Sequence, residues 1–245
     1  ASTQSGIISH NMQLAILGRQ ARLGLAELES LAGAENVQPI GRDAALIKGD
    51  VDGSRLGSVV RLATHLDEID THNWQTVVNK ILKTLPNELL HYPEGKIKVG
   101  LSVYGLNVNS RAMLAAGLEI KKACRTLGRS VRIVPNTGPE LNAAQVIHND
   151  LTGDLGCELL IIKDTNSTHI AQTTWIQDIE AYAARDHGRP HRDAFVGMLP
   201  PKLAQTMLNL AQTTPENRVL DPFCGTGVVL QEAALLGCAV YGSDL

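Results

Sequence analysis

The segment Asp-Pro-Phe-Cys-Gly-Thr-Gly, from Asp221 to Gly227, constrains the fold more than any other part of the chain. A short apolar strand ends at Asp221, and the glycines predict a tight turn into a helix over residues 228–236. Glycines at such a turn let the backbone approach a ligand closely, and the helix start presents unpaired N–H groups. The next strand ends near Asp244, 23 residues after Asp221. This pattern predicts a nucleotide-cofactor site at the carboxyl edge of a sheet.

The spacing of the motif does not favour NAD as the cofactor. A GxGxxG fingerprint would need a third glycine where Leu230 stands. Carboxylates at successive strand ends, Asp221 and Asp244, suit instead an adenosine that carries a positively charged sulfonium and amine. Two alternatives remain open: the motif is a structural turn in an unrelated α/β protein, or Cys224 is a nucleophile. No histidine neighbours Cys224 in the sequence, so we interpret it as a small loop residue.

Upstream of the motif, hydrophobic periodicity predicts two further units. The first has strands at 12–17, 36–40, 44–49 and 66–71, with helices at 20–32 and from Ser54 to Ala63. This order indicates a small α+β domain. The second has helices at 74–85, 110–127 and 140–151, with strands at 96–103, 131–134, 159–162 and 168–177. The unbroken apolar run at 159–162 predicts a mostly parallel sheet that is buried on both faces. We therefore expect a fold of mixed α/β and α+β class.

Charge is concentrated in one short block of an otherwise acidic chain. The formal net charge is −3, yet residues 96–132 hold 8 lysines and arginines against 1 acidic residue. Such a block is typical of a phosphate-binding surface, although a solvated helix face is the simpler alternative. The chain has only 2 Trp, 4 Tyr and 2 Phe, which favours contact with RNA by shape over a stacking groove. The candidate residues in the block are Lys96, Lys98, Lys121, Lys122, Arg125, Arg129 and Arg132.

Other features narrow the class of protein. We expect no membrane span and no signal peptide, because no run of about 18 apolar residues occurs and residues 1–11 are polar. The four cysteines show no CxxC pair or metal-ligand spacing, which predicts a cytoplasmic protein without a zinc site. Two histidines lie between Arg185 and Arg192, but their spacing matches no common metal-ligand set, so linker packing and phosphate contact are the preferred interpretations.

The motif resembles the first motif of the class I S-adenosylmethionine-dependent methyltransferases, in the branch that methylates amino groups. The resemblance implies that the loop holds the methionine part of S-adenosylmethionine and that Asp244 accepts hydrogen bonds from the ribose hydroxyls. It also implies that the turn before the helix at Pro200 closes over the cofactor, and Lys202 in that turn has either a functional or a solvated role. The residues implied to bind the cofactor are Pro200, Asp221, Pro222, Phe223, Cys224, Gly225, Thr226, Gly227 and Asp244.

The order of the units resembles the THUMP-domain RNA methyltransferases, in particular the type that methylates the N2 amine of guanosine in tRNA. The resemblance implies a ferredoxin-like domain at 1–72, a THUMP RNA-binding domain at 73–178, a linker at 179–199 and the beginning of a Rossmann-like class I methyltransferase domain at 200–245. The implied partner is the acceptor region of tRNA. Arg185, Arg189 and Arg192 in the linker are further candidates for RNA contact.

The same family places an Asn/Asp-Pro-Pro-aromatic motif several strands further on, where it holds the amine and stacks on a flipped-out base. Residues 1–245 contain no such motif, so we assign no catalytic residue. We expect a chain that is truncated early in the methyltransferase domain and is catalytically incomplete. We expect its binding of S-adenosylmethionine to be weak or absent. The alternatives are an N6-adenine methyltransferase acting on DNA or rRNA, and a non-catalytic RNA-binding module.

Overall fold

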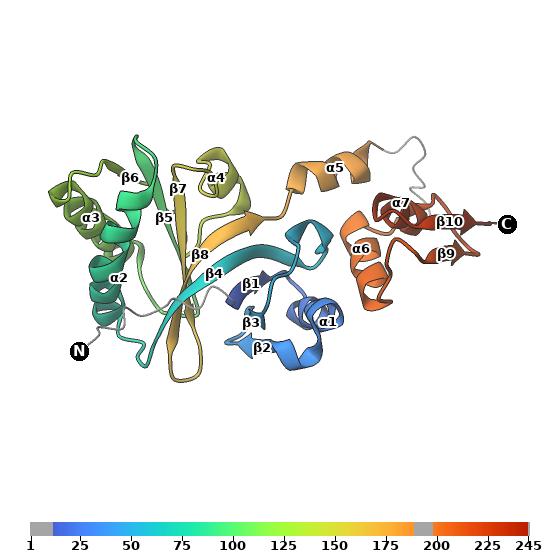
Figure 1. Cartoon of the computed structure of the whole chain (residues 1–245), viewed down its shortest axis with the longest axis horizontal. Coiled ribbons are helices and arrows are strands. Elements are labelled where there is room, and N and C mark those ends of the chain that lie inside the picture. Colours follow the sequence, from blue (N-terminus) through green and yellow to red (C-terminus); the bar gives the residue numbers. More distant parts are fainter. Residues whose placement is uncertain (1–11, 189–197, 245) are drawn as a thin grey trace, which may run out of the picture.

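The computed structural model describes residues 12–188 and 198–244 (Figure 1). Its main feature is one mixed sheet in the order β2-β3-β1-β4-β8-β7-β5-β6. The strands are β1 (Met12–Leu17), β2 (Val37–Ile40), β3 (Ala44–Lys48), β4 (Val59–Ile69), β5 (Ile97–Tyr104), β6 (Val131–Ile133), β7 (Gly156–Lys163) and β8 (Thr168–Ile176). The helices beside it are α1 (Ala21–Ala32), α2 (Trp74–Glu88), α3 (Ser110–Thr126), α4 (Ala143–His148) and α5 (Ile179–His187). A mixed α/β fold with a large mixed sheet is thus confirmed.

The sheet runs without a break through the expected domain boundary at residue 72. β5 is parallel to β6 and to β7, while β4 pairs with β8 and β8 with β7 in antiparallel fashion. The expected mostly parallel pairing of the second unit is thus found in β5, β6 and β7, whereas β8 returns antiparallel to β7 and joins this unit to β4. The limits of the individual domains remain predictions.

One predicted helix, from Ser54 to Ala63, was wrong. The chain makes a single 3₁₀ turn at Gly53–Arg55, in which the Asp52 carboxylate accepts a hydrogen bond from the Ser54 N–H, and then enters β4. Val59, Leu62 and Ala63 are all buried in that strand. Strand pairing on both sides of β4 outweighs the weak helical pattern of these residues. The predicted strand at 66–71 is the far part of β4.

A second local expectation, that the helix from residue 74 ends before Pro86, was also wrong. α2 continues to Glu88, with Leu85, Pro86 and the following Leu89 buried. A proline in the last turn removes one hydrogen bond to the carbonyl four residues back, and burial of the flanking leucines compensates for that loss. The packing of this region therefore extends the helix past its sequence breaker.

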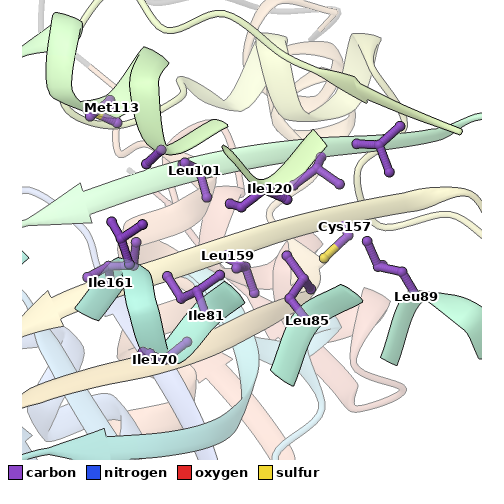
Figure 2. Packing of buried hydrophobic residues seen from close by; sticks show 14 of the residues in the cluster. Ile81, Leu85, Leu89, Leu101, Met113, Ile120, Cys157, Leu159, Ile161 and Ile170 are labelled. Atoms are coloured by element: carbon purple, nitrogen blue, oxygen red, sulfur yellow. The ribbon is translucent and has the colours of Figure 1, made fainter. Parts of the chain in front are cut away.

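The main hydrophobic core lies between the sheet and the pair α2 and α3 (Figure 2). In β7, Cys157, Leu159 and Ile161 point into this core, whereas Leu160 and Ile162 belong to a second core on the opposite face. The apolar run at 159–162 is therefore buried on both faces, as predicted. α1 covers the β1–β3 part of the sheet through Leu28 and its neighbours, which form a third cluster.

A buried ion pair links the strands at the middle of the sheet. Arg61 of β4 and Glu158 of β7 approach to 2.6 Å, and their side chains are 5% and 0% exposed. The Glu158 carboxylate also accepts hydrogen bonds from Ser102 Oγ at 2.6 Å and Thr173 Oγ1 at 2.7 Å. A buried charge is tolerated only when it is paired and hydrogen-bonded in this way.

The C-terminal unit contains α6 (Pro201–Leu210), β9 (Arg218–Asp221), α7 (Val228–Leu235) and β10 (Ala239–Gly242). β9 and β10 are parallel and form a separate two-stranded sheet, in agreement with the predicted strand, turn, helix and strand. α6 and α7 pack on each other around Leu208, Ala233 and Cys238. Figure 1 shows this unit at one end of an elongated molecule, with α2 and α3 at the other.

Candidate functional site

The loop between β9 and α7 is held by hydrogen bonds to the chain that follows β10. The Asp221 carboxylate accepts a hydrogen bond from the Phe223 N–H at 3.1 Å, which fixes the start of the turn. The Ser243 N–H donates to the Asp221 carbonyl at 3.1 Å, and the Cys224 N–H donates to the Ser243 carbonyl at 3.0 Å. The Gly225 N–H donates to the carboxylate of Asp244. The two predicted acids are therefore brought to one loop, as the parallel pairing of β9 and β10 requires.

Two glycines in this loop have backbone conformations that other residues rarely adopt. Gly225 has φ 49° and Gly227 has φ 76°, both in the left-handed region. A Cβ built on either residue would meet no other atom within 4 Å, so the backbone is open on that side. Gly227 directly precedes α7, whose first N–H groups are unpaired within the helix. This arrangement is suited to a ligand that lies against the backbone at a helix N-terminus.

Gly242 on β10 has a different reason to be glycine. A Cβ there would lie 2.4 Å from Leu230 Cδ1 and 3.1 Å from Cys224 Sγ. Any side chain at this position would push α7 away from the strand and distort the loop. The thiol of Cys224 consequently packs against β10, which agrees with its interpretation as a small loop residue.

Around the loop, large apolar side chains are exposed. Phe223 is 76% exposed, and Leu220 and Tyr241 on the two strands are also exposed. Phe223, the aromatic residue of the motif, is therefore not part of the small hydrophobic core beneath α7.

The predicted helix start at Pro200 is confirmed, with Pro201 at the first helical position. The carbonyl of Pro200 accepts hydrogen bonds from the Leu203 and Ala204 N–H groups. Lys202 extends from the same turn, and its Nζ donates to Gln177 Oε1 at 2.5 Å and lies 5.1 Å from the centre of the Tyr182 ring. Burial lowers the pKa of Lys202. Its side chain is therefore directed to the segment that follows β8, not to solvent.

α6 also contacts α1 through a buried polar cluster that the sequence analysis missed. The Glu27 carboxylate of α1 accepts hydrogen bonds from the Gly57 N–H, the Ser58 N–H and Asn209 Nδ2, each at 2.8 Å. Asn209 Nδ2 also donates to the Arg55 carbonyl at 2.6 Å. A signal was present, because Glu27 is a charged residue four positions from both Leu23 and Leu31, on a helix face expected to be apolar.

Further contacts reinforce this junction. The single O–H of Tyr182 lies within hydrogen-bond distance of two acceptors, the Leu56 carbonyl at 3.2 Å and Gln205 Oε1, and burial raises the pKa of Tyr182 to about 12. Gln177 Nε2 donates to the carbonyls of Leu56, Gly57 and Val59. A Cβ on Gly57 would lie 2.2 Å from the Lys202 carbonyl oxygen, so the loop before β4 and α6 are in direct backbone contact.

The predicted basic surface divides into separate parts. Lys96, Lys121, Arg125 and Arg129 line one hollow at the end of α3. Lys98 and Arg132 are neighbours in the β5–β6 register, and they lie on the sheet face opposite Ile97 and Val131, which belong to the α2–α3 core. Lys122 is exposed on α3.

Of the three arginines predicted in the linker, only Arg185 lies among the described residues. Arg185 lies on α5, where the sequence predicted a connecting segment. Its Nε donates to the nearly buried Glu232 carboxylate at 2.8 Å, and its guanidinium lies 4.4 Å from the centre of the Tyr182 ring. Arg185 therefore ties α5 to α7. Arg189 and Arg192 lie outside the described residues.

Comparison with known proteins identifies the C-terminal region. Residues 189–244 match the family described as RMKL-like, methyltransferase domain. A tRNA (guanine(10)-N2)-dimethyltransferase of Methanothermobacter thermautotrophicus is 44% identical over 70 residues, which cover 26% of this chain and 21% of the relative. A tRNA (guanine(6)-N2)-methyltransferase of Thermus thermophilus is 51% identical over 55 residues, which cover 21% and 16% of the two chains. These matches span about a fifth of each curated relative.

The fold itself is similar to that of solved structures over nearly the whole chain. TrmN from Thermus thermophilus aligns with a TM-score of 0.50 and 21% identity, covering 96% of this chain and 65% of that one. The structure of SMU.472 complexed with SAH aligns with a TM-score of 0.52 and 15% identity, covering 93% and 56%. Among the described residues, no helix is long and apolar enough to cross a membrane.

Proposed function

We propose that this chain is part of an S-adenosylmethionine-dependent methyltransferase that acts on the exocyclic N2 amine of a guanosine in tRNA. The observation that carries the proposal is the loop in which the Gly225 N–H donates to the Asp244 carboxylate, inside the segment that matches a methyltransferase family. The matching relatives from Methanothermobacter and Thermus are both named as tRNA guanine-N2 enzymes.

In this proposal the chain has the order of units expected from the sequence. A ferredoxin-like unit at 1–72 and a THUMP unit at 73–178 share the large sheet, and a Rossmann-like methyltransferase domain begins at Pro200. The four cysteines are free thiols, which supports a location in the reducing cytoplasm.

The loop residues fit S-adenosylmethionine. The open backbone at Gly225 and Gly227 leaves space for the methionine part beside the start of α7, and Asp244 at the second strand end would accept hydrogen bonds from ribose hydroxyls. When bound, S-adenosylmethionine would supply an electrophilic methyl group, whose bond to sulfur breaks as the bond to the acceptor nitrogen forms, so that a neutral thioether leaves and the amine loses a proton. The task of the protein is then to align the acceptor nitrogen and exclude water.

The junction between α1 and α6 gives this alignment a structural basis. In this proposal RNA held by the basic residues around α3 is fixed relative to the large sheet, and α6 is fixed to the same sheet by the hydrogen bonds of Asn209 to Glu27 and of Lys202 to Gln177. α6 in turn packs on α7, which follows the cofactor loop. The chain therefore connects an RNA-binding surface to the cofactor loop through packed elements, as a methyltransferase with a distant target nucleotide requires.

The test is methyl transfer by the complete gene product to unmodified tRNA, with the modified nucleoside identified by mass spectrometry. We expect N2-methylguanosine, and we expect Asp244→Asn to weaken S-adenosylmethionine binding with little change in tRNA affinity. Asp154→Asn, at an exposed position far along the chain, serves as the matched control. Methylation of adenine, or no transfer to any tRNA, would reject the proposal.

A further inference from the structure

A hollow of about 330 Å³ opens where α3 ends and where β5 and β6 begin. Its volume corresponds to roughly ten water molecules in the liquid, so it has room for a phosphate group and the atoms attached to it. The residues that line it are Lys96, Lys121, Arg125, Gly128, Arg129, Ser130 and Val131.

The charges around the hollow have one sign. Four of its lining residues are cations, and no carboxylate lines it in the described part of the chain. None of the ion pairs found between described residues includes Lys96, Lys121 or Arg125. Like charges that converge on one concave surface repel one another, and a bound anion would remove this repulsion.

The backbone that carries these side chains is well defined. α3 ends in a turn in which the Gly128 N–H donates to the Arg125 carbonyl and the Arg129 N–H donates to the Cys124 carbonyl. Gly128 has φ 80°, a conformation that favours glycine at a helix end. The Ile97 N–H donates to the Ser130 carbonyl at 3.0 Å, which fixes the start of β5 against the turn.

One of the four cations is also held by its side chain. Arg129 Nη2 donates to the Pro93 carbonyl at 2.7 Å and to the Tyr92 carbonyl at 3.1 Å. Its guanidinium therefore keeps its place without a ligand, and part of the side-chain entropy cost of binding is already met. Lys121 and Arg125, four residues apart, reach the same hollow from one face of α3.

We propose that this hollow is a preformed seat for one phosphate group of the bound RNA. The inference rests on the proposed function and deepens it, because it selects four of the candidate basic residues and leaves out Lys98 and Arg132. Two sources share this chemistry: the 5′-terminal monophosphate of the RNA and a phosphodiester within its backbone.

The experiment measures tRNA affinity of the complete gene product as a function of salt concentration. The test variant is Lys121→Gln/Arg125→Gln, and the matched control is Lys48→Gln/Lys83→Gln, which removes two exposed lysines elsewhere. Thermal unfolding checks that both variants remain folded. We expect the test variant to bind at least roughly tenfold more weakly at low salt, since each substitution removes a charged hydrogen-bond donor to the phosphate. The slope of its log affinity against log salt concentration should fall by the equivalent of about one phosphate contact. The slope of the control should change little.

A pair of tRNAs, one with a 5′-monophosphate and one with a 5′-hydroxyl, distinguishes the two sources. If the seat takes the terminal phosphate, removal of that phosphate lowers the RNA affinity of the wild-type protein as much as the double substitution does. The variant then binds both RNAs with equal affinity. If the seat takes a phosphodiester, the wild-type protein binds both RNAs equally and the variant is weaker for each.

If the test and control substitutions lowered tRNA affinity equally, the proposed phosphate seat would be rejected and the proposed function would stand. Failure of the wild-type protein to bind tRNA at all would instead reject the proposed function. Additional substitution of Lys96→Gln gives an independent check, because residues that share one phosphate have non-additive effects.

Discussion

The carboxylate of Glu27 on α1 accepts a hydrogen bond from the side-chain amide of Asn209 on α6 at 2.8 Å, although the two residues are 182 positions apart in the chain. Both side chains are buried, and the same carboxylate caps the Gly57 and Ser58 N–H groups. α6 is thereby attached to the large sheet by directional contacts between buried groups. Such contacts define one relative orientation more strictly than apolar packing alone.

Asn209→Ala tests this attachment. Asn209 Nδ2 also donates to the Arg55 carbonyl, so the substitution leaves two buried acceptors with fewer partners. We expect the free energy of unfolding to fall by about 1–3 kcal/mol. Urea titration measures it, with Asn79→Ala at an exposed position of α2 as the control. Equal effects of the two substitutions would contradict the importance of the cluster.

Gly57→Ala tests the backbone contact at the same junction. The new methyl group would lie 2.2 Å from the Lys202 carbonyl oxygen and 2.5 Å from Thr206 Oγ1, so α6 must shift. We expect a loss of about 1–3 kcal/mol, as for other overpacked sites, with faster amide exchange in α6 than in the sheet. Gly138→Ala is the control, because its nearest neighbour would be 4.0 Å away. Unchanged exchange in α6 would show that the contact is not restrictive.

Arg61→Ala tests the buried ion pair at the centre of the sheet. The substitution leaves Glu158 charged and buried without its guanidinium partner, which costs about 3–5 kcal/mol. The half-exposed pair between Lys80 and Asp67 provides the comparison, and we expect Lys80→Ala to cost at most about 1 kcal/mol. Denaturant midpoints at pH 7 measure both. A small effect at Arg61 would mean that water reaches Glu158.

The imidazoles of His65 and His169 predict how stability depends on pH. Their Nε2 and Nδ1 atoms lie 3.1 Å apart, and burial together with His169 lowers the pKa of His65 below 6.5. The unfolded chain therefore binds the proton more readily than the folded chain does. Stability should fall as the pH drops from 6.5 through the lowered pKa, and it should be fully present above 6.5.

Urea midpoints between pH 5 and pH 7.5 measure this effect. His65→Gln should flatten the dependence, whereas substitution of the exposed His148 should leave it unchanged. The pKa of the Asp164 carboxyl is lowered mainly by a hydrogen bond from the Gly41 N–H. This carboxyl therefore affects stability in a separate and more acidic pH range. An unchanged slope in His65→Gln would assign the dependence to another group.

A functional prediction concerns the polypeptide of residues 1–245 by itself. We expect it to bind tRNA and to transfer no methyl group, because its sequence holds no Asn/Asp-Pro-Pro-aromatic motif to position the amine. Binding is measured by gel shift and transfer with labelled S-adenosylmethionine, with the complete gene product as the positive control. Robust turnover by residues 1–245 would show that another group performs this role.

The C-terminal loop was predictable because its determinants are local. Asp221, the two glycines and the apolar residues after them specify a strand, a turn and a helix within one short segment. The unbroken apolar run of β7 also predicted that this strand is buried on both faces. Local patterns of this kind depend on backbone geometry and on the period of the side chains, which the sequence displays directly.

The tertiary structure decided what depends on partners far apart in the chain. Residues 59–63, which the sequence predicted to be helical, form the first part of β4 because β1 and β8 pair with both of its edges. The basic residues that looked like one surface were divided by the register of β5 and β6, and Arg185 was engaged by Glu232. The contact between Glu27 and Asn209 forms only when α1 and α6 meet, and no local pattern encodes that meeting. The sequence alone therefore determined most of the elements and the cofactor motif, whereas long-range packing decided the first part of β4 and how the elements are joined.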